Sequence, residues 1–185
     1  MDKTNRTEIH RSFLIEALTE PLTRASAHIQ IFDNYLLNTR LRLRSIRNPE
    51  SGGWTRVLQQ RFPSVEGSLS SLKFSEIYLN DVEYALFESF EGNEIRKNRY
   101  FHEFDGRSFA FDVFLGPLWG LNIARVEFET ADDLANLVLP PFAVVEVTED
   151  AFFQGESLVT KTFRDVQDEV AKFGPEIAAA NIPDE

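Results

Sequence analysis

Apolar and polar residues alternate along most of this chain, and a repeat of two positions is typical of β-strands rather than helices. Turn-forming pairs such as Gly52-Gly53 separate the alternating runs. The pattern predicts about eight strands, at Glu8–Ile15, His28–Leu37, Arg40–Ile46, Thr55–Phe62, Ile95–Phe104, Ser108–Phe114, Ile123–Glu129 and Ala143–Thr148.

Three segments carry helical signals instead. Asn80 and Glu83 form a capping box at the start of the first helix, and Gly92 is placed to end it. Thr130 begins a second, shorter helix that stops before Pro140. The third helix carries an apolar stripe made of Phe163, Val166, Val170 and Phe173. A strand-rich chain with helices inserted between its strands favours an antiparallel sheet or barrel of the α+β class over βαβ units.

Charged residues occupy every second position in several of the predicted strands. In RLRLR, three arginines share one face of the strand and two leucines share the other. Other strands carry charge with the same spacing, at Lys97 and Arg99, at Asp112, and at Glu127 and Glu129. An antiparallel sheet with one face in water produces this alternation, and so does a closed barrel whose charged faces point inward.

The two arrangements differ in their chemistry. A barrel of about eight strands must fill its interior with side chains or with a ligand. Inward arginines and lysines would bind phosphate oxygens, and inward carboxylates would bind a divalent cation. A metal-bound polyphosphate satisfies both kinds of group, whereas an open sheet needs no ligand at all.

The charge of the chain narrows the range of possible binding partners. The chain of 185 residues has a formal net charge of -11, which argues against general binding to nucleic acid or to anionic membranes. Six arginines nevertheless lie close together, with Glu50 as the only acid among them: Arg40, Arg42, Arg44, Arg47, Arg56 and Arg61. Such a concentration of positive charge in an acidic chain indicates a local anion site.

Cysteine content and hydropathy bear on location. The absence of cysteine excludes disulfides, thiolate catalysis and cysteine zinc sites, and it fits a reducing compartment. The N-terminus has no apolar segment that resembles a signal peptide, and the longest apolar run, LVLPPFAVV, is too short to span a bilayer. We therefore expect a soluble, cytoplasmic protein. The length predicts one domain over residues 1–185, with a core of about 7–160 and a C-terminal helix and tail over 161–185.

Other catalytic chemistry has little support in the residues. The three histidines, His10, His28 and His102, do not have the spacing of a zinc motif. The chain has no glycine-rich phosphate loop and nothing that suggests a nucleophile elbow. The alternating strands are therefore the main indication of a binding site.

Six segments follow one another between about Glu8 and Leu158: EIHRSFLI, IQIFDNYL followed by RLRLR, VLQQRF, IRKNRY, AFDVFLGPLWGLNIARVEFE and PPFAVVEVTED. In this order they resemble the motifs of the CYTH domain, or triphosphate tunnel metalloenzyme, family. Thiamine triphosphatases, inorganic triphosphatases and class IV adenylyl cyclases belong to that family. The resemblance implies an eight-stranded closed antiparallel β-barrel with helices packed outside.

The resemblance also implies a ligand, because basic residues of the family's tunnel hold a triphosphate. The ligand would be a small-molecule triphosphate or inorganic polyphosphate. Matching positions assign phosphate binding to Arg40, Arg42, Arg44, Arg61, Lys73, Lys97 and Arg99. Asp112 matches the family aspartate that orients an arginine.

Glutamates of the family hold Mg or Mn ions, which polarise the phosphoryl group and help to orient a water nucleophile. The matching positions suggest Glu8 and Glu127 as catalytic, metal-binding residues, with Glu129 or His10 as further ligands. His10 is either a nitrogen ligand for Mn or a hydrogen-bonding residue inside the tunnel. The chain departs from the family pattern at three positions, with His10 in place of a glutamate, Ser12 in place of a lysine and Arg125 in place of a glutamate.

Two functions therefore remain. The first is a divergent metal-dependent triphosphatase, a hydrolase that cleaves tripolyphosphate or an organic triphosphate. The second is a catalytically weak or inactive relative that binds polyphosphate or a nucleotide through its cations. The lost carboxylates and the added guanidinium make the predicted tunnel more attractive to phosphate and less attractive to Mg.

Overall fold

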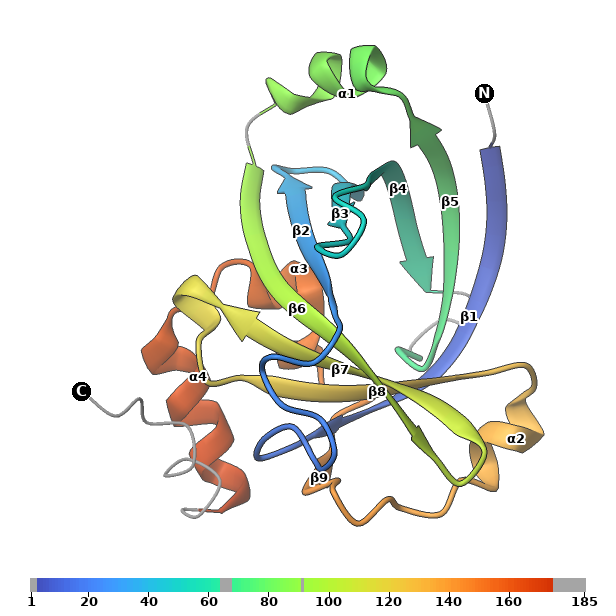
Figure 1. Ribbon diagram of the computed structural model, residues 1–185, viewed down its shortest axis with the longest axis vertical. Helices are drawn as coiled ribbons and strands as arrows, with labels where there is room; N and C mark the ends of the chain where they lie inside the picture. The colour runs from blue at the N-terminus through green and yellow to red at the C-terminus, as the bar shows by residue number, and fades with distance from the viewer. Residues whose placement is uncertain (1–2, 64–67, 91, 175–185) are drawn as a thin grey trace.

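Antiparallel strands form the body of the molecule (Figure 1). The computed structural model describes residues 3–63, 68–90 and 92–174. Its main strands are β1 (Lys3–Leu14), β2 (Ile29–Leu36), β3 (Leu41–Arg47), β4 (Trp54–Pro63), β5 (Ser71–Leu79), β6 (Gly92–Phe104), β7 (Arg107–Leu115) and β8 (Asn122–Phe128). They are hydrogen-bonded in the order β5-β4-β3-β2-β6-β7-β8-β1, and a further pairing between β1 and β5 closes the ring. The predicted closed, eight-stranded barrel is confirmed.

β1 closes the barrel by pairing with different neighbours along its length. Its first part, from Lys3 to Ile9, pairs with β5, and the part from Ile9 to Leu14 pairs with β8. A ninth strand, β9 (Val145–Glu146), lies on the edge of β1 beyond β5. Side chains that lie opposite each other in an antiparallel pair share a face of the sheet, so residues of β1 and β8 meet inside the barrel.

Two of the strand predictions need correction. The alternation predicted no strand at β5, because Glu76 occupies a buried position in line with Leu72 and Phe74 and hides the apolar face. The strand predicted at Ala143–Thr148 is reduced to the two residues of β9, because β5 already pairs with the earlier part of that edge of β1.

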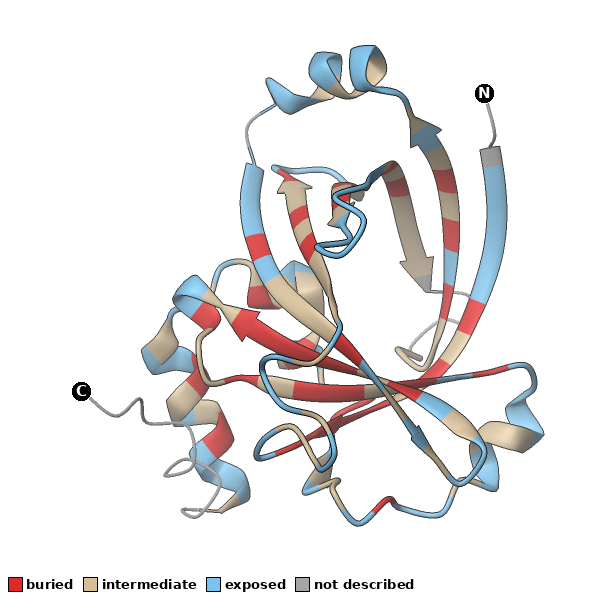
Figure 2. Cartoon of the chain, in the orientation of Figure 1, coloured by how far each residue is buried: buried red, intermediate tan, exposed pale blue. Residues whose placement is uncertain are grey.

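The helices are α1 (Asp81–Glu88), α2 (Ala131–Ala135), α3 (Gly155–Leu158) and α4 (Phe163–Val170), with 3₁₀ turns at Gly116–Leu118, Ala151–Phe153 and Ala171–Phe173. The predicted capping box of Asn80 and Glu83 is present. However, α1 ends at Glu88 and Gly92 begins β6, so the predicted helix end is wrong. α1 buries no side chain against the barrel (Figure 2). None of the helices in the described ranges has the length and apolar character needed to cross a membrane.

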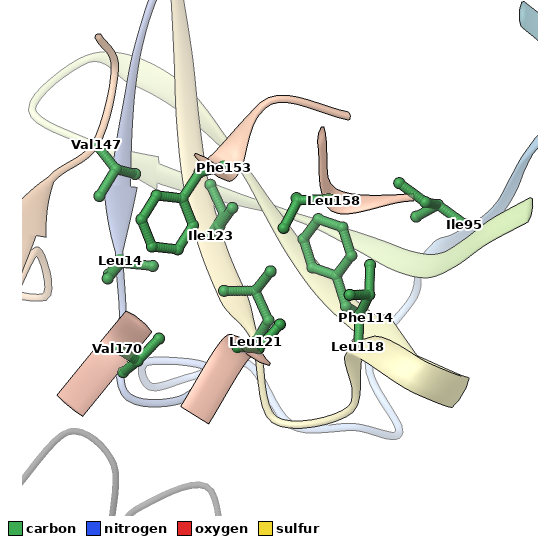
Figure 3. Close-up of a cluster of buried hydrophobic side chains, with 11 residues drawn as sticks. Leu14, Ile95, Phe114, Leu118, Leu121, Ile123, Val147, Phe153, Leu158 and Val170 are labelled. Atoms are coloured by element: carbon green, nitrogen blue, oxygen red, sulfur yellow. The ribbon is translucent and has the colours of Figure 1, made fainter. Parts of the chain in front are cut away.

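Apolar packing lies at one end of the barrel and on its outer surface. One buried cluster joins Ile95, Phe114 and Ile123 of the barrel to Phe153 and Leu158 near α3 (Figure 3). α4 covers this cluster with two valines of its predicted apolar stripe. A second cluster packs on the other side of the β7 and β8 strands, around Phe109, Phe111 and Val126. Residues 175–185 of the predicted tail lie outside the described residues.

The inward faces change character along each strand. On β6, Lys97 and Arg99 follow Ile95 at two-residue spacing, and on β8 Arg125 and Glu127 follow Ile123 in the same way. Because this spacing keeps side chains on one face, each strand contributes an apolar residue near α3 and charged residues farther along the lumen. The apolar cluster thus closes the lumen on one side of the charged residues.

Candidate functional site

A cavity of about 100 Å³ lies inside the barrel among these charged residues. Seven of its described lining side chains are cationic, Arg6, Arg42, Arg44, Arg61, Lys97, Arg99 and Arg125, and three are anionic, Glu8, Asp112 and Glu127. The lining therefore has a formal excess of four positive charges at neutral pH, in a chain whose net charge is -11. This local reversal of sign favours an anion over a cation in the cavity.

Buried Asp33 on β2 organises two of the cations. Nε and Nη2 of Arg44 donate to its two carboxylate oxygens at 2.6 and 2.7 Å, and Nη1 of Arg42 lies 3.6 Å from Oδ2. Burial alone would raise the pKa of Asp33, but the guanidiniums of Arg42 and Arg44 hold it well below its usual value. Asp33 is therefore ionised at neutral pH and holds both arginines in position.

Buried Asp112 on β7 does the same for two cations of β6. Nε and Nη2 of Arg99 donate to it at 2.6 and 2.8 Å, and Nζ of Lys97 donates at 2.6 Å. Against the effect of burial, these cations lower the pKa of Asp112 to about 2. Burial in turn lowers the pKa of Lys97 to about 8, although Asp112 opposes the change. We call the surface formed by Asp33, Asp112 and the four cations that they hold, Arg42, Arg44, Lys97 and Arg99, the cation wall.

Residues near α3 hold Arg61, which projects from β4. Its Nη1 donates to Glu156 at 2.5 Å and its Nη2 donates to Gln154 at 2.7 Å. Gly155, between them, packs so closely on Tyr35 that a Cβ atom there would overlap the phenol oxygen. Arg61 therefore meets the cavity at the side that the C-terminal segment closes.

A different arrangement forms the surface opposite, where β1 and β8 pair. Arg6, Glu8, Arg125 and Glu127 project from these strands into the cavity, and we call them the mixed wall. Nη2 of Arg125 contacts Oε1 of Glu8, and Nη1 of Arg6 lies 2.9 Å from Oε2 of the same carboxylate. Nη1 of Arg6 is also 3.7 Å from Oε2 of Glu127. A guanidinium therefore lies beside each oxygen of Glu8.

His10 and Ser12 lie on β1 beside the mixed wall. His10 is fully buried, and among the described residues neither of its ring nitrogens has a hydrogen-bond partner. Burial, assisted by Arg61, lowers the pKa of His10 to about 4, so its ring is neutral at pH 7. Ser12 lies directly opposite Arg125 in the pairing of β1 with β8.

Four of the predicted site residues lie away from the described lining of the cavity: His10, Arg40, Lys73 and Glu129. Arg40 is exposed just before β3, and Lys73 is exposed on β5 between the buried Leu72 and Phe74. Glu129 is exposed beyond the end of β8 and borders a separate surface hollow. The other predicted phosphate-binding residues, Arg42, Arg44, Arg61, Lys97 and Arg99, line the cavity together with Glu8, Glu127 and Asp112.

The fit of a divalent cation can be tested on these side chains. In the described part of the chain, no three histidine or acidic residues are grouped so that they could hold a metal ion. Glu8 is bound by two guanidiniums, and the nearest nitrogen of His10 is 3.8 Å from its carboxylate. Mg needs several oxygen ligands in near-octahedral geometry. The mixed wall in this arrangement does not fit such an ion.

Several residues of the site were not predicted from the sequence. Asp33 could have been noticed in the sequence, because it is an acidic residue at an inward position of the IQIFDNYL segment. Its partner could not be predicted, because a single acid in an apolar strand does not show which cation it pairs with. Gln59, which accepts from Nε of Arg42 at 2.9 Å, looked like an ordinary polar strand residue. Arg6 lies before the first recognised motif, so only its position on β1 brings it to Glu8.

Comparisons with known proteins agree with this geometry. Over 95 residues the chain is 35% identical to an inorganic triphosphatase of Nitrosomonas europaea, a match that covers 50% of this chain and 62% of that protein. The match thus spans less than two thirds of the relative. No family model matches the chain.

Two crystal structures resemble the barrel. One, of a hypothetical protein, is 26% identical with a TM-score of 0.56 and covers 84% of this chain and 99% of its own. The other, of an inorganic triphosphatase, is 26% identical with a TM-score of 0.54 and covers 82% of this chain and 93% of its own. These similarities confirm the resemblance that the sequence motifs indicated.

Proposed function

We propose that this chain, a member of the CYTH or triphosphate tunnel family, binds a linear triphosphate group inside its barrel. The observation that carries the proposal is the excess of four positive charges lining a cavity in a protein of net charge -11. A linear triphosphate carries about four negative charges near neutral pH, counting about two on its terminal group and one on each other group. The ligand and the lining therefore have opposite charges, and Asp33 and Glu156, which pair with three of the cations, offset part of the positive charge.

The cation wall is preorganised for phosphate oxygens. Arg44 and Arg99 each donate from Nε and Nη2 to a buried aspartate, and their Nη1 groups take no part in these pairs. A guanidinium held along one edge presents its remaining N–H groups in a fixed direction. Little side-chain freedom is then lost when an anion binds, which favours affinity.

The second candidate function is hydrolysis of the triphosphate, and the similarity to an inorganic triphosphatase favours it. Of the acids lining the cavity, Glu127 is the one suited to accept a proton from water, because its side chain is 53% exposed and lies 3.7 Å from its nearest guanidinium. Glu8, bound on both oxygens, is less able to do so. The cations of the cavity would stabilise charge on the transferred phosphoryl group.

Calorimetric titration with tripolyphosphate tests the proposal. We expect saturable one-to-one binding that is tighter than binding of pyrophosphate or orthophosphate, because longer chains reach more of the cations. Absence of binding with and without divalent cations would overturn it.

Phosphate release from tripolyphosphate, ATP and thiamine triphosphate separates the two functions. Release that a Glu127→Gln variant loses while it still binds tripolyphosphate would establish hydrolysis. Binding without release under Mg, Mn or a chelator would leave a binding protein.

A further inference from the structure

Arg125 is a cation that the predicted phosphate-binding set does not include. It extends from β8 into the cavity directly opposite Ser12, the small buried residue that stands where the family pattern has a lysine. Its side chain is 21% exposed, and burial lowers its pKa to about 10, so that it stays protonated at neutral pH. The β1–β8 pair therefore retains a positive charge in the lumen, carried by the opposite strand.

The neighbours of Arg125 determine how its positive charge affects metal binding. It contacts one oxygen of Glu8 while Arg6 binds the other at 2.9 Å, and Arg6 also lies 3.7 Å from Glu127. Two guanidiniums thus neutralise two carboxylates, and the mixed wall has no formal net charge. A divalent cation that approached this carboxylate would meet a guanidinium beside each of its oxygens, and the two positive charges would repel it.

We propose that Arg125, beside Glu8, is a further phosphate-binding cation of this barrel, and that the guanidiniums of Arg125 and Arg6 replace a metal ion at Glu8, so that the barrel binds tripolyphosphate without a divalent cation. The inference rests on the proposed function and specifies its ligand as the metal-free polyphosphate anion. A magnesium complex of tripolyphosphate carries two fewer negative charges and so gains less from the seven cations of the lining. Mg therefore competes with the protein for the anion.

The wild-type protein provides the first test. Tripolyphosphate is titrated by calorimetry in excess EDTA and then in excess MgCl₂, at equal ionic strength. We expect binding in EDTA that is at least as tight as binding in MgCl₂. Binding that occurs only with Mg overturns this inference and leaves the proposed function intact, whereas no binding in either buffer overturns the proposed function itself.

Two variants of Arg125 provide the second test. In EDTA, Arg125→Gln should weaken tripolyphosphate binding about 10- to 100-fold, the usual cost of losing a charged hydrogen-bond donor. Arg125→Glu removes the cation and adds a third carboxylate near Glu8 and Glu127, so it should bind weakly in EDTA and recover affinity in MgCl₂. This reversal of the metal response separates a role in binding from a merely structural role.

The control is Arg96→Gln, which removes a positive charge from a 62% exposed side chain on β6. It should retain the affinity of the wild type in both buffers. Thermal unfolding confirms that each variant is folded before titration. Wild-type affinity of a folded Arg125→Gln variant in EDTA, or an unchanged metal response of a folded Arg125→Glu variant, would contradict the proposal.

Discussion

The cation wall and the mixed wall face each other across one lumen, but they use carboxylates in opposite ways. In the cation wall each buried aspartate serves two cations, so that Asp33 and Asp112 leave a surplus of positive charge. In the mixed wall one glutamate, Glu8, is shared by two arginines, and a second, Glu127, balances the charge. The same residue types thus give a cationic surface on one side and a neutral one on the other.

The difference lies in how exposed the partners of the buried carboxylates are, since Glu8 is buried like Asp33 and Asp112. Asp33 and Asp112 are buried, and a buried carboxylate needs partners for both of its oxygens, so it fixes the side chains around it. On the mixed wall the side chains of Arg6 and Glu127 are 40% and 53% exposed and are held less firmly. We infer that the cation wall sets affinity and that the mixed wall sets the response to metal.

Reversing one charge in the cation wall should have the largest effect. Arg44→Glu removes a donor, repels the anion and places a second carboxylate beside Asp33. We expect tripolyphosphate affinity to fall by about 100-fold or more, measured by calorimetry. Arg96→Glu, the same change at an exposed position of β6, should have little effect. Equal losses in the two variants would mean that net charge, not the cation wall, governs binding.

The two walls should also differ in how much their acids contribute to folding. Asp33→Asn leaves Arg42 and Arg44 without their buried counter-ion, and we expect the free energy of unfolding in urea to fall by about 3 kcal/mol. Glu127→Gln alters a half-exposed pair and should change it by about 0.5 kcal/mol or less. Similar values for the two variants would show that the walls are equally rigid.

Lys97 gives the cation wall a pH dependence. Because burial lowers its pKa to about 8, the ammonium loses its proton as the pH rises from 7 to 9, and the anion loses a partner. We expect the wild-type affinity to fall about 3- to 10-fold relative to a Lys97→Arg variant over this range, since both proteins meet the same ligand ionisation. If the affinities of the two proteins changed with pH in the same way, Lys97 would not contribute to anion binding.

Deprotonation of Lys97 should change the stability of the unliganded protein in the opposite direction, so that stability rises as the pH rises. The pKa of Lys97 is about 8 when folded and 10.5 in its ordinary range, so the unfolded chain binds more protons between these values. Stability therefore rises with pH in that window, and the burial penalty of the ammonium is fully present below pH 8. Urea unfolding of the wild type and of Lys97→Arg at pH 7.5 and 10 measures the difference.

A small effect on stability is also expected at His10, the buried neighbour of the mixed wall. Its ring is neutral at pH 7 and neither nitrogen has a hydrogen-bond partner in the described part of the chain. His10→Phe removes two unpaired polar atoms and keeps an aromatic ring, so the free energy of unfolding should change by about 1 kcal/mol or less. A much larger loss would show that the imidazole nitrogens have partners that stabilise the fold.

Much of the fold followed from alternation, because an inward residue at every second position is a property of the strand itself. Arg42 and Arg44, or Lys97 and Arg99, could be assigned to one surface without knowing their neighbours. β5 was missed because its inward face mixes Glu76 with apolar residues, which a barrel lumen accepts and an ordinary core does not.

The pairing of charges could not be predicted in the same way. That Arg125 contacts Glu8 and faces Ser12 depends on the register between two distant strands, which no local pattern contains. The role of Asp33 likewise depends on the register between β2 and β3, which places Arg44 opposite it. The lost carboxylates and Arg125 were visible in the sequence, but the contacts of Arg125 and Arg6 with Glu8 were not.

The way in which β1 closes the barrel has a consequence for folding. The N-terminal strand must find β8, with Ile9 opposite Phe128, and contacts so distant along the chain form late because loop closure costs entropy. The mixed wall exists only after this step, whereas the pairs between β2 and β3 and between β6 and β7 are local. We infer that the contacts that complete the ligand site form late in folding, so an anion that bridges both walls also stabilises the pairing of β1 with β8.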